Sequence, residues 1–551
     1  MNPDETAPEA STAQPAAAAT SGARRWWALG ALALSVLVVG LDLFVLTLAL
    51  PTLSADLHAS TSDLQWFVDA YSLVLAAALL PAGLLGDRLG RKKVLLVALA
   101  LFGAASLACA YAGSAGELIG ARAVLGVAAA VILPMALAVI PVLFTAAERP
   151  KAIAIVGGAT FLGFPIGPVL GGWLLDHFWW GSVFLINVPV VVIAGAAVLW
   201  LMPESRASRR PRIDVAGVAV SSAGLAALVY GVIQAGQNGW SDPTAMVTTA
   251  AGVVLLAAFA VWERAVGRRA GGEPLVNLTL FRSAGFTWGT ILSTMISFAL
   301  FGITFAMPQY FLDVRGLDSL ASGLRLLPLI GGLAVGLGIG QRLQSPRQTA
   351  DGLPQRGPLV GAKILVSGGF LIMAAALAVG TATTAGSGTG FVSAWFAVAG
   401  LGLGLALPTA LNAALGALTA ERSGSGSALI TAMRQVGATI GVAVLGTVLN
   451  SVYQSRLALG GLPHAAADAA HASVAGGLAV ARETGSAALL SAVRGAYASG
   501  LDVMLWVCAG IAVTAALLAA AFLPRQEQPQ DAGLRDAEPG GAGVREVAGA
   551  E

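Results

Sequence analysis

Long apolar stretches recur along the whole chain, and this repetition constrains the fold more than any other feature. We count fourteen of them, each about 21 residues long, close to the roughly 20 residues that a helix needs to cross a bilayer. Only 11% of the residues are charged, whereas an ordinary globular domain carries about 25%. The sequence therefore predicts an all-α, polytopic membrane protein with fourteen transmembrane helices and argues against a soluble enzyme.

The limits of the apolar stretches give the expected spans. A polar, Gly-rich or Ala/Pro/Ser-rich composition at both ends of the chain predicts disordered cytoplasmic tails. The spanning helices are expected at residues 26–50, 64–85, 94–112, 118–141, 152–175, 182–202, 213–234, 244–263, 285–309, 321–341, 360–380, 390–412, 428–451 and 501–523.

The positions of lysine and arginine indicate the orientation. With both termini inside, about 25 of the 31 Lys and Arg residues lie in cytoplasmic loops, about five lie outside, and one, Arg122, lies within a helix. We therefore expect a multi-pass protein of the cytoplasmic (cell inner) membrane, in contact with lipid and monomeric, with both termini cytoplasmic. Nucleic acid is not an expected partner. The cysteines and histidines lack metal-ligand spacing, so we expect neither a metal nor another cofactor.

Two parts of the chain echo one another, which suggests an internal repeat. Gly126 precedes Pro134 by eight residues, and Gly400 precedes Pro408 by the same spacing. Repeats of this kind are a common basis of transporter folds. We expect a surface helix or hairpin in the long outer loop of the second half. The expected organisation is a tail (1–25), a six-helix half (26–202), two inserted helices with their loops (203–284), a six-helix half with an outer loop at 452–500 (285–523) and a tail (524–551).

The loop after the second span carries the most specific motif, which runs Gly-Leu-Leu-Gly-Asp-Arg-Leu-Gly-Arg-Lys-Lys from residue 83. Glycines permit a tight turn, and an aspartate can cap a helix. An ordinary positive-inside loop explains the cations but not this order. The order resembles the loop between helices 2 and 3 of the major facilitator superfamily. The resemblance implies a conformational latch on the cytoplasmic side, formed by Gly83, Gly86, Asp87, Arg88, Gly90 and Arg91.

The fifth span contains closely spaced glycines and prolines. Proline removes a backbone donor and bends a helix, and small residues let a neighbouring helix approach, so helix packing alone is one explanation. The pattern Gly-x-x-x-Gly-Pro-x-x-Gly-Gly also looks like the antiporter motif of drug-exporting families in the same superfamily. The residues that carry it are Gly163, Gly167, Pro168, Gly171 and Gly172.

The first two spans add a narrower resemblance. Residues 41–51 are similar to a signature of the fourteen-helix drug:proton antiporters, with Phe44 and Thr47 standing where that family has Thr and Asn. Residues 65–73 resemble the corresponding segment of exporters of cationic antiseptics and dyes, through Trp66, Asp69 and Tyr71. The resemblance covers about residues 26–451 and 501–523 and implies a major facilitator fold.

Charged residues inside the spans point to a functional layer. A charge at the centre of a spanning helix costs about 2.5–3.5 kcal/mol, so it normally faces a partner or a cavity. Of the 29 acidic residues, only Asp42 and Asp69 lie clearly inside predicted spans, at about 12 Å and 8 Å below the outer surface. Arg122 lies at a similar depth, so the three side chains can share one layer.

Each of the three charges also has a purely structural interpretation. Asp42 can belong to a buried structural pair, Asp69 can be a carboxylate in contact with water, and Arg122 can pair with Glu117 or extend to the surface. The family resemblance implies instead that Asp42 and Arg122 take part in proton coupling. It also implies an aromatic, cation-binding cavity, for which the candidates are Asp69, Trp66, Tyr71 and Phe164.

The function that the resemblance implies is export of amphipathic, cationic drugs or antibiotics in exchange for protons, by alternating access. No ATP-binding loop is present in the sequence, so a proton gradient is the expected energy source, and no catalytic residues are expected. Three alternatives stay open: a dedicated exporter of one secondary metabolite, a proton-coupled importer, and a non-transporting receptor on the same fold.

Overall fold

The structure, a computed structural model, describes most of the chain. The predicted tails lie outside it except for residues 22–25 and 524, and residues 22–25 already belong to the first helix. The described residues are 22–57, 59, 61–145, 148–205, 214–269, 274, 276, 278–344, 347–348, 354–356, 360–416, 418, 423–457, 463–472 and 474–524.

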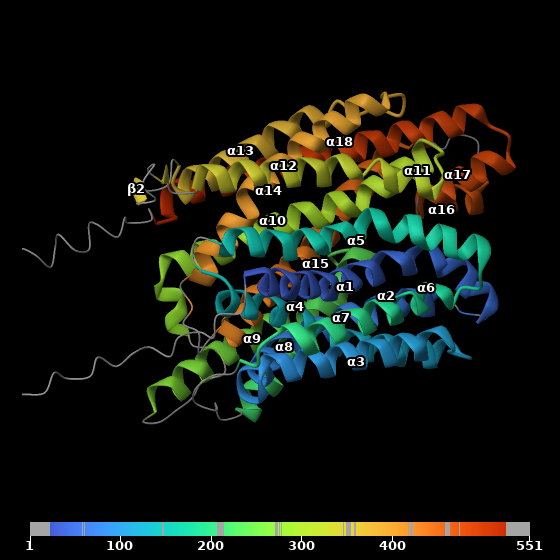
Figure 1. Cartoon of the computed structure of the whole chain (residues 1–551). Coiled ribbons are helices and arrows are strands. Elements are labelled where there is room, and N and C mark those ends of the chain that lie inside the picture. Colours follow the sequence, from blue (N-terminus) through green and yellow to red (C-terminus); the bar gives the residue numbers. More distant parts are fainter. Residues whose placement is uncertain are drawn as a thin grey trace, which may run out of the picture.

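Helices make up nearly all of the described chain (Figure 1). The first group comprises α1 (Gly22–Asp56), α2 (Thr61–Leu89), α3 (Arg91–Ala110), α4 (Ala115–Leu143), α5 (Arg149–His177), α6 (Ser182–Leu185) and α7 (Asn187–Leu201). Two helices and a 3-10 turn follow, namely α8 (Val215–Asn238), α9 (Pro243–Arg268) and η1 (Leu278–Arg282). The last group comprises α10 (Ala284–Gln309), the π-helical turn η2 (Tyr310–Val314), α11 (Ser319–Leu324), α12 (Leu327–Gln344), α13 (Ala362–Gly380), α14 (Thr389–Gly416), α15 (Ser423–Arg456), α16 (His464–Ala472), α17 (Val474–Glu483) and α18 (Ala487–Phe522).

The predicted membrane architecture is confirmed. Within the described residues, thirteen helical segments are long and apolar enough to cross a membrane. The remaining predicted span, 152–175, lies within α5, which is 29 residues long. The helices run roughly along one direction, and α1 begins at the same end of the bundle at which α18 finishes (Figure 1).

The structure differs from the prediction in detail at two loops. The segment 452–500 contains α16 and α17, in keeping with the expected surface helix or hairpin, but α18 begins fourteen residues before the predicted start at 501. The Ser486 side chain accepts a hydrogen bond from the Leu489 amide at 3.1 Å and so caps α18. The polar segment after α12 contains a small antiparallel pair, β1 (Arg347–Gln348) and β2 (Pro354–Arg356).

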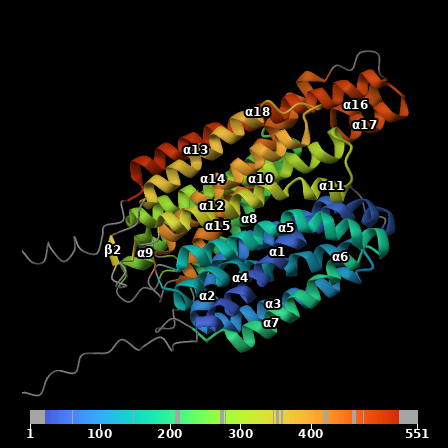
Figure 2. The same cartoon turned by 45° about the horizontal axis from the view of Figure 1, so that its top comes forward.

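Helix packing follows the same order in the two groups. In the first group α1 packs on α5, α2 on α4 and α3 on α7; in the last group α10 packs on α15, α12 on α14 and α13 on α18. Each pair joins the same positions in a series of six spans, which supports our proposal of two related halves. Figure 2 shows α1–α7 in its lower part and α13, α14 and α18 in its upper part.

The halves meet along two seams. At one seam α2 packs on α15, and at the other α5 packs on α11, α12 and α14. The pair α8 and α9 packs tightly together, and α8 contacts both α2 and α15. The inserted helices therefore lie against the first seam.

Candidate functional site

Asp42 and Arg122 form a buried ion pair between α1 and α4. Arg122 Nη1 donates to Asp42 Oδ2; Asp42 is 2% exposed and Arg122 is 0% exposed. The sequence prediction of one shared layer thus holds for these two charges. The alternative partner, Glu117, is exposed and accepts a hydrogen bond from the Gly113 amide at 2.8 Å instead.

A buried amide from α7 completes the contacts of this carboxylate. Asn187 Nδ2 donates to Asp42 Oδ1 at 3.2 Å and lies 3.3 Å from Ser106 Oγ of α3. Asn187 and Ser106 are both almost fully buried. The sequence analysis missed them, although an asparagine at the start of an apolar span was a visible signal. Helices α1, α4 and α7 therefore meet at one carboxylate, and α3 is joined to it through Asn187.

Two residues of α2 hold the Arg122 side chain. Its Nε donates to the Phe67 carbonyl at 2.8 Å, and its guanidinium lies 4.5 Å from the centre of the Tyr71 ring. A cation over an aromatic face is stabilised by the ring quadrupole. Tyr71, expected in the substrate cavity, is fully buried against Arg122.

The other expected substrate residues lie elsewhere around α2. Asp69 is two residues from both Phe67 and Tyr71 and remains partly exposed. Trp66 stacks on Tyr230 of α8 with ring centres 6.2 Å apart, so it reaches toward an inserted helix. Asp69 follows Trp66 by three residues and shares its face of α2. The Phe164 side chain lies outside the described part of the structure.

The loop motif forms a compact turn between α2 and α3. Asp87 and Arg91 make a buried salt bridge of 2.8 Å, while Arg88 is partly exposed. Gly90 alone separates the two helices, and its φ of +107° is a backbone conformation that favours glycine. The Arg91 amide donates to the Ser205 carbonyl at 2.8 Å, which ties the turn to the end of α7.

Two further glycines of this motif line the packing surface of α2. Gly83 and Gly86 are buried, and a Cβ on Gly86 would lie 2.2 Å from Met135 Sδ of α4. Glycine at this position therefore lets α2 and α4 approach closely.

The glycines of the fifth span place α5 directly on α1. A Cβ on Gly163 would lie 2.5 Å from the carbonyl carbon of Gly40, two residues before Asp42. Gly167 and Gly171 are buried, and Gly172 is partly buried. The Pro168 side chain lies outside the described atoms, although α5 continues through it. This contact fixes the part of α1 that carries the ion pair.

Two charges within spans escaped the sequence analysis. Arg434 lies in α15, inside the predicted span 428–451, and its Nε donates to Ser297 Oγ of α10 at 3.2 Å. It was counted among the loop cations. Glu263, at the end of the span 244–263, is 2% exposed and accepts the Val276 amide at 3.1 Å. Asp42 and Asp69 are therefore not the only acids inside predicted spans.

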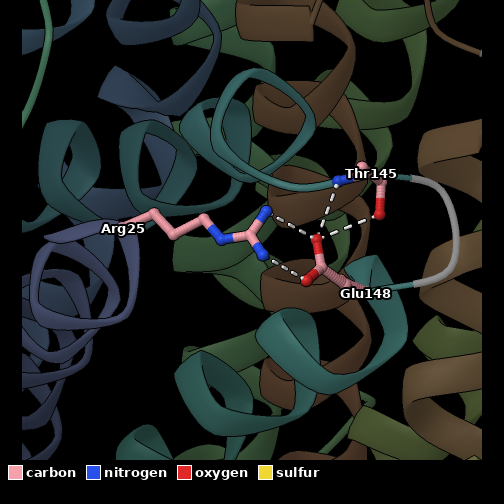
Figure 3. Close-up of polar contacts among 3 residues, drawn as sticks. All are labelled: Arg25, Thr145 and Glu148. Atoms are coloured by element: carbon pink, nitrogen blue, oxygen red, sulfur yellow. Dashed lines mark hydrogen bonds and ion pairs between the residues drawn. The ribbon is translucent and has the colours of Figure 1, made fainter. Parts of the chain in front are cut away.

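A polar cluster joins the beginning of α1 to the turn between α4 and α5 (Figure 3). The Glu148 carboxylate accepts two hydrogen bonds from Arg25, at 2.7 and 3.0 Å, and one from the Thr145 hydroxyl at 3.0 Å. The rings of the adjacent residues Trp26 and Phe144 lie 5.0 Å apart. The sequence analysis found no role for this segment. The cluster anchors the N-terminal end of α1.

Comparison with known proteins gives consistent results. A sequence model of the Major Facilitator Superfamily matches residues 32–442. The chain is 33% identical over 522 residues to the tetracenomycin C resistance and export protein of Streptomyces glaucescens, covering 92% of this chain and 93% of that protein. It is 35% identical over 503 residues to the multidrug efflux pump LfrA of Mycolicibacterium smegmatis, with 90% and 95% covered. It is 31% identical over 444 residues to the methyl viologen resistance protein SmvA of Salmonella typhimurium, with 79% and 85% covered.

Solved structures of similar shape show the fold alone. A double-tryptophan mutant of XylE matches with a TM-score of 0.56 at 14% identity, covering 92% of this chain and 97% of that chain. A bacterial homologue of the lysosomal transporter Spinster, in its inward-facing and unoccupied conformation, matches with a TM-score of 0.54 at 18% identity, covering 93% and 100%.

Proposed function

The chain belongs to the Major Facilitator Superfamily, and from this premise we propose that it is a proton-coupled antiporter of amphipathic drugs or antibiotics, cationic ones among them. It is a transporter and not an enzyme, and it crosses the membrane many times. Export across the cytoplasmic membrane would proceed by alternating access, with both termini in the cytoplasm. The observation that carries the proposal is the buried pair of Asp42 and Arg122.

The pair offers a physical route from proton binding to movement. Removing one partner of a buried ion pair costs about 3–5 kcal/mol, because the other charge is left unpaired in a low-dielectric interior. Protonation of Asp42 would neutralise its carboxylate and leave the positive charge of Arg122 unpaired in the interior. The surroundings of Arg122 would therefore have to rearrange, and α1 and α4 would shift relative to each other.

We assign substrate recognition to the partly exposed face of α2 next to the ion pair. Asp69 and Trp66 share a face of α2, and a carboxylate beside an aromatic ring suits an amphipathic cation. Tyr71 would connect this face with Arg122, and we keep Phe164 as a candidate wall residue. Methyl viologen is a dication, so the name of the Salmonella relative supports a cationic substrate class for this chain.

The glycine-rich motifs would serve the conformational change. The turn from Gly83 to Arg91 lies beside the seam of α2 and α15 and would latch its cytoplasmic end. The α5 motif from Gly163 to Gly172 would let α5 bend while it stays packed on α1.

Inside-out vesicles with an imposed pH gradient test the coupling. Wild-type protein should accumulate the dye ethidium when the gradient is present, and Asp42→Asn should abolish this uptake while the protein remains in the membrane. Asp56→Asn is the matched control, because Asp56 is exposed near the outer end of the same helix. Wild-type uptake by Asp42→Asn would exclude Asp42 as the proton site, and efflux driven by the same gradient would indicate an importer.

A dedicated exporter of one secondary metabolite is the second candidate. The name of the Streptomyces glaucescens relative, which covers nearly the whole chain, refers to a single antibiotic. A panel of unrelated compounds in the same vesicles separates the two functions. Gradient-driven uptake of several chemical classes supports a multidrug exporter, whereas uptake of one class supports the dedicated exporter.

A further inference from the structure

Arg434 is a cation inside the membrane without an anionic partner among the described residues. It lies eleven residues after the start of α15, or about 16 Å along the helix axis. Ser297 Oγ, at 3.2 Å from its Nε, is its hydrogen-bond partner, and none of the salt bridges between described residues includes it. Among the described residues, Arg434 therefore has no ion pair like that of Arg122 with Asp42.

One serine leaves most of the guanidinium unsatisfied. Arginine carries five N–H donors, and Ser297 accepts one of them. The terminal nitrogens of Arg434 are not sealed, in contrast to the buried unpaired Tyr71 hydroxyl. Arg434 is partly exposed, so these nitrogens are the part of its side chain that a ligand can contact. An unpaired cation at this depth is costly, and it normally marks a functional contact.

The helix geometry shows where this cation faces. Ser427, seven residues earlier on α15, donates to the Pro134 carbonyl of α4 at 3.1 Å. Seven residues are nearly two full turns, so Arg434 lies on the same face of α15 and is directed toward the first half. On α4, Val127 lies seven residues before Pro134 and is 39% exposed. The two halves touch at Ser427 and Pro134, and about two turns farther along the same faces stand the exposed Val127 and the partly exposed Arg434.

We propose that Arg434 binds an acidic oxygen of the exported molecule, a carboxylate or a phenolate on an aromatic ring system. The planar guanidinium can accept such a group in a two-pronged geometry and can also stack on the ring. The proposal rests on the drug-export function and deepens it. Asp69 in one half and Arg434 in the other then extend the substrate range to compounds that carry both charges.

Equilibrium binding with two matched probes tests this assignment. Anthraquinone-2-carboxylate and anthraquinone-2-carboxamide share their ring system and differ in charge. Purified full-length protein should bind the carboxylate, and Arg434→Gln should weaken this binding by about tenfold to a hundredfold, the usual range for a charge-assisted hydrogen bond. Binding of the carboxamide should change by less than about threefold. Arg434→Lys keeps the positive charge but not the two-pronged guanidinium geometry, so it should give an intermediate loss of carboxylate affinity.

Further variants keep the test decisive. Arg456→Gln, at the exposed outer end of α15, should leave both affinities unchanged. If Arg434→Gln fails to fold, Ser297→Ala removes the hydrogen bond that orients the guanidinium, and a selective several-fold loss of the carboxylate supports the proposal. Equal losses of both probes, or no carboxylate binding by wild-type protein, would overturn it. These measurements use no pH gradient, so they decide the role of Arg434 even if gradient-driven export fails.

Discussion

At the scale of single residues, Asp42 and Asp69 differ in how much of each residue is exposed. Asp42 is sealed by Arg122 and Asn187 and can exchange a proton only when its surroundings move. Asp69 lies on the neighbouring helix α2 and remains partly exposed. We therefore expect the two carboxylates to perform separate tasks.

Replacing each carboxylate separates these tasks. Asp69→Asn should weaken export of a permanently charged dye and largely spare a neutral antibiotic, because a carboxylate in a low-dielectric site attracts a cation strongly. Asp42→Asn should impair both compounds, because it removes the coupling itself. Rates for ethidium and for chloramphenicol in the same vesicles provide the comparison. Equal losses of both compounds in Asp69→Asn would remove its charge-selecting role.

Residue-level prediction from the sequence succeeded where a charge stood alone. Asp42 and Arg122 were expected in one layer because few charges interrupt these spans, and the structure joins them. Asn187 carries no charge, so although a polar residue at the start of an apolar span is visible in the sequence, its contact with Asp42 cannot be told from ordinary helix packing. Arg434 was missed because its span begins close to basic loop residues, and a count by segment assigned it to the cytoplasm.

At the scale of elements, the crossing of α1 and α5 depends on paired glycines. Gly163→Ala would force the helices apart at Gly40, and we expect a loss of about 1–3 kcal/mol in the free energy of unfolding. Gly157→Ala is the matched control on the same helix, because no atom lies within 4 Å of its added Cβ. Alanine favours a helix over glycine by up to about 1 kcal/mol, so this control should stabilise the protein. Thermal unfolding of the purified variants measures both changes in stability. If the two variants change stability equally, the close contact at Gly163 has no special role.

The turn between α2 and α3 makes a different prediction. Asp87→Asn removes the buried partner of Arg91 and should bias the balance between inward and outward states. Ligand affinity should stay within about threefold, while transport slows. Lys93→Gln, an exposed neighbour, should change neither quantity. Loss of binding by a folded Asp87→Asn protein would place Asp87 in the substrate site instead.

The length of the apolar stretches predicted the spanning helices well but did not predict the bounds of α16 and α17. The fourteen expected ranges each coincide with a helix or a pair of short helices, because only a helix satisfies its own backbone in lipid. The segments α16 and α17 are short and rich in alanine and glycine. They are held by tertiary contacts such as the hydrogen bond from Tyr453 to the Ala470 carbonyl, at 2.9 Å, which local sequence does not reveal.

At the scale of the whole molecule, the expected orientation can be tested with added cysteines. Cys109 and Cys508 are 0% exposed, so the native chain should react little with a membrane-impermeant maleimide. Asp468→Cys on α16 should react in intact cells, and Arg342→Cys at the end of α12 should react only after permeabilisation. Both positions are exposed. The reverse pattern would place both termini outside.

The placement of α8 makes the two seams between the halves different. An amphipathic compound partitions into lipid, and an exporter can admit it sideways from the bilayer. At the seam between α2 and α15, α8 stands between the halves and the surrounding lipid, and Trp66 is stacked on it. At the seam between α5 and α12, no inserted helix among the described residues takes such a position. We therefore expect lateral entry from the membrane to occur on one side only, with cargo dissolved in lipid arriving along α5.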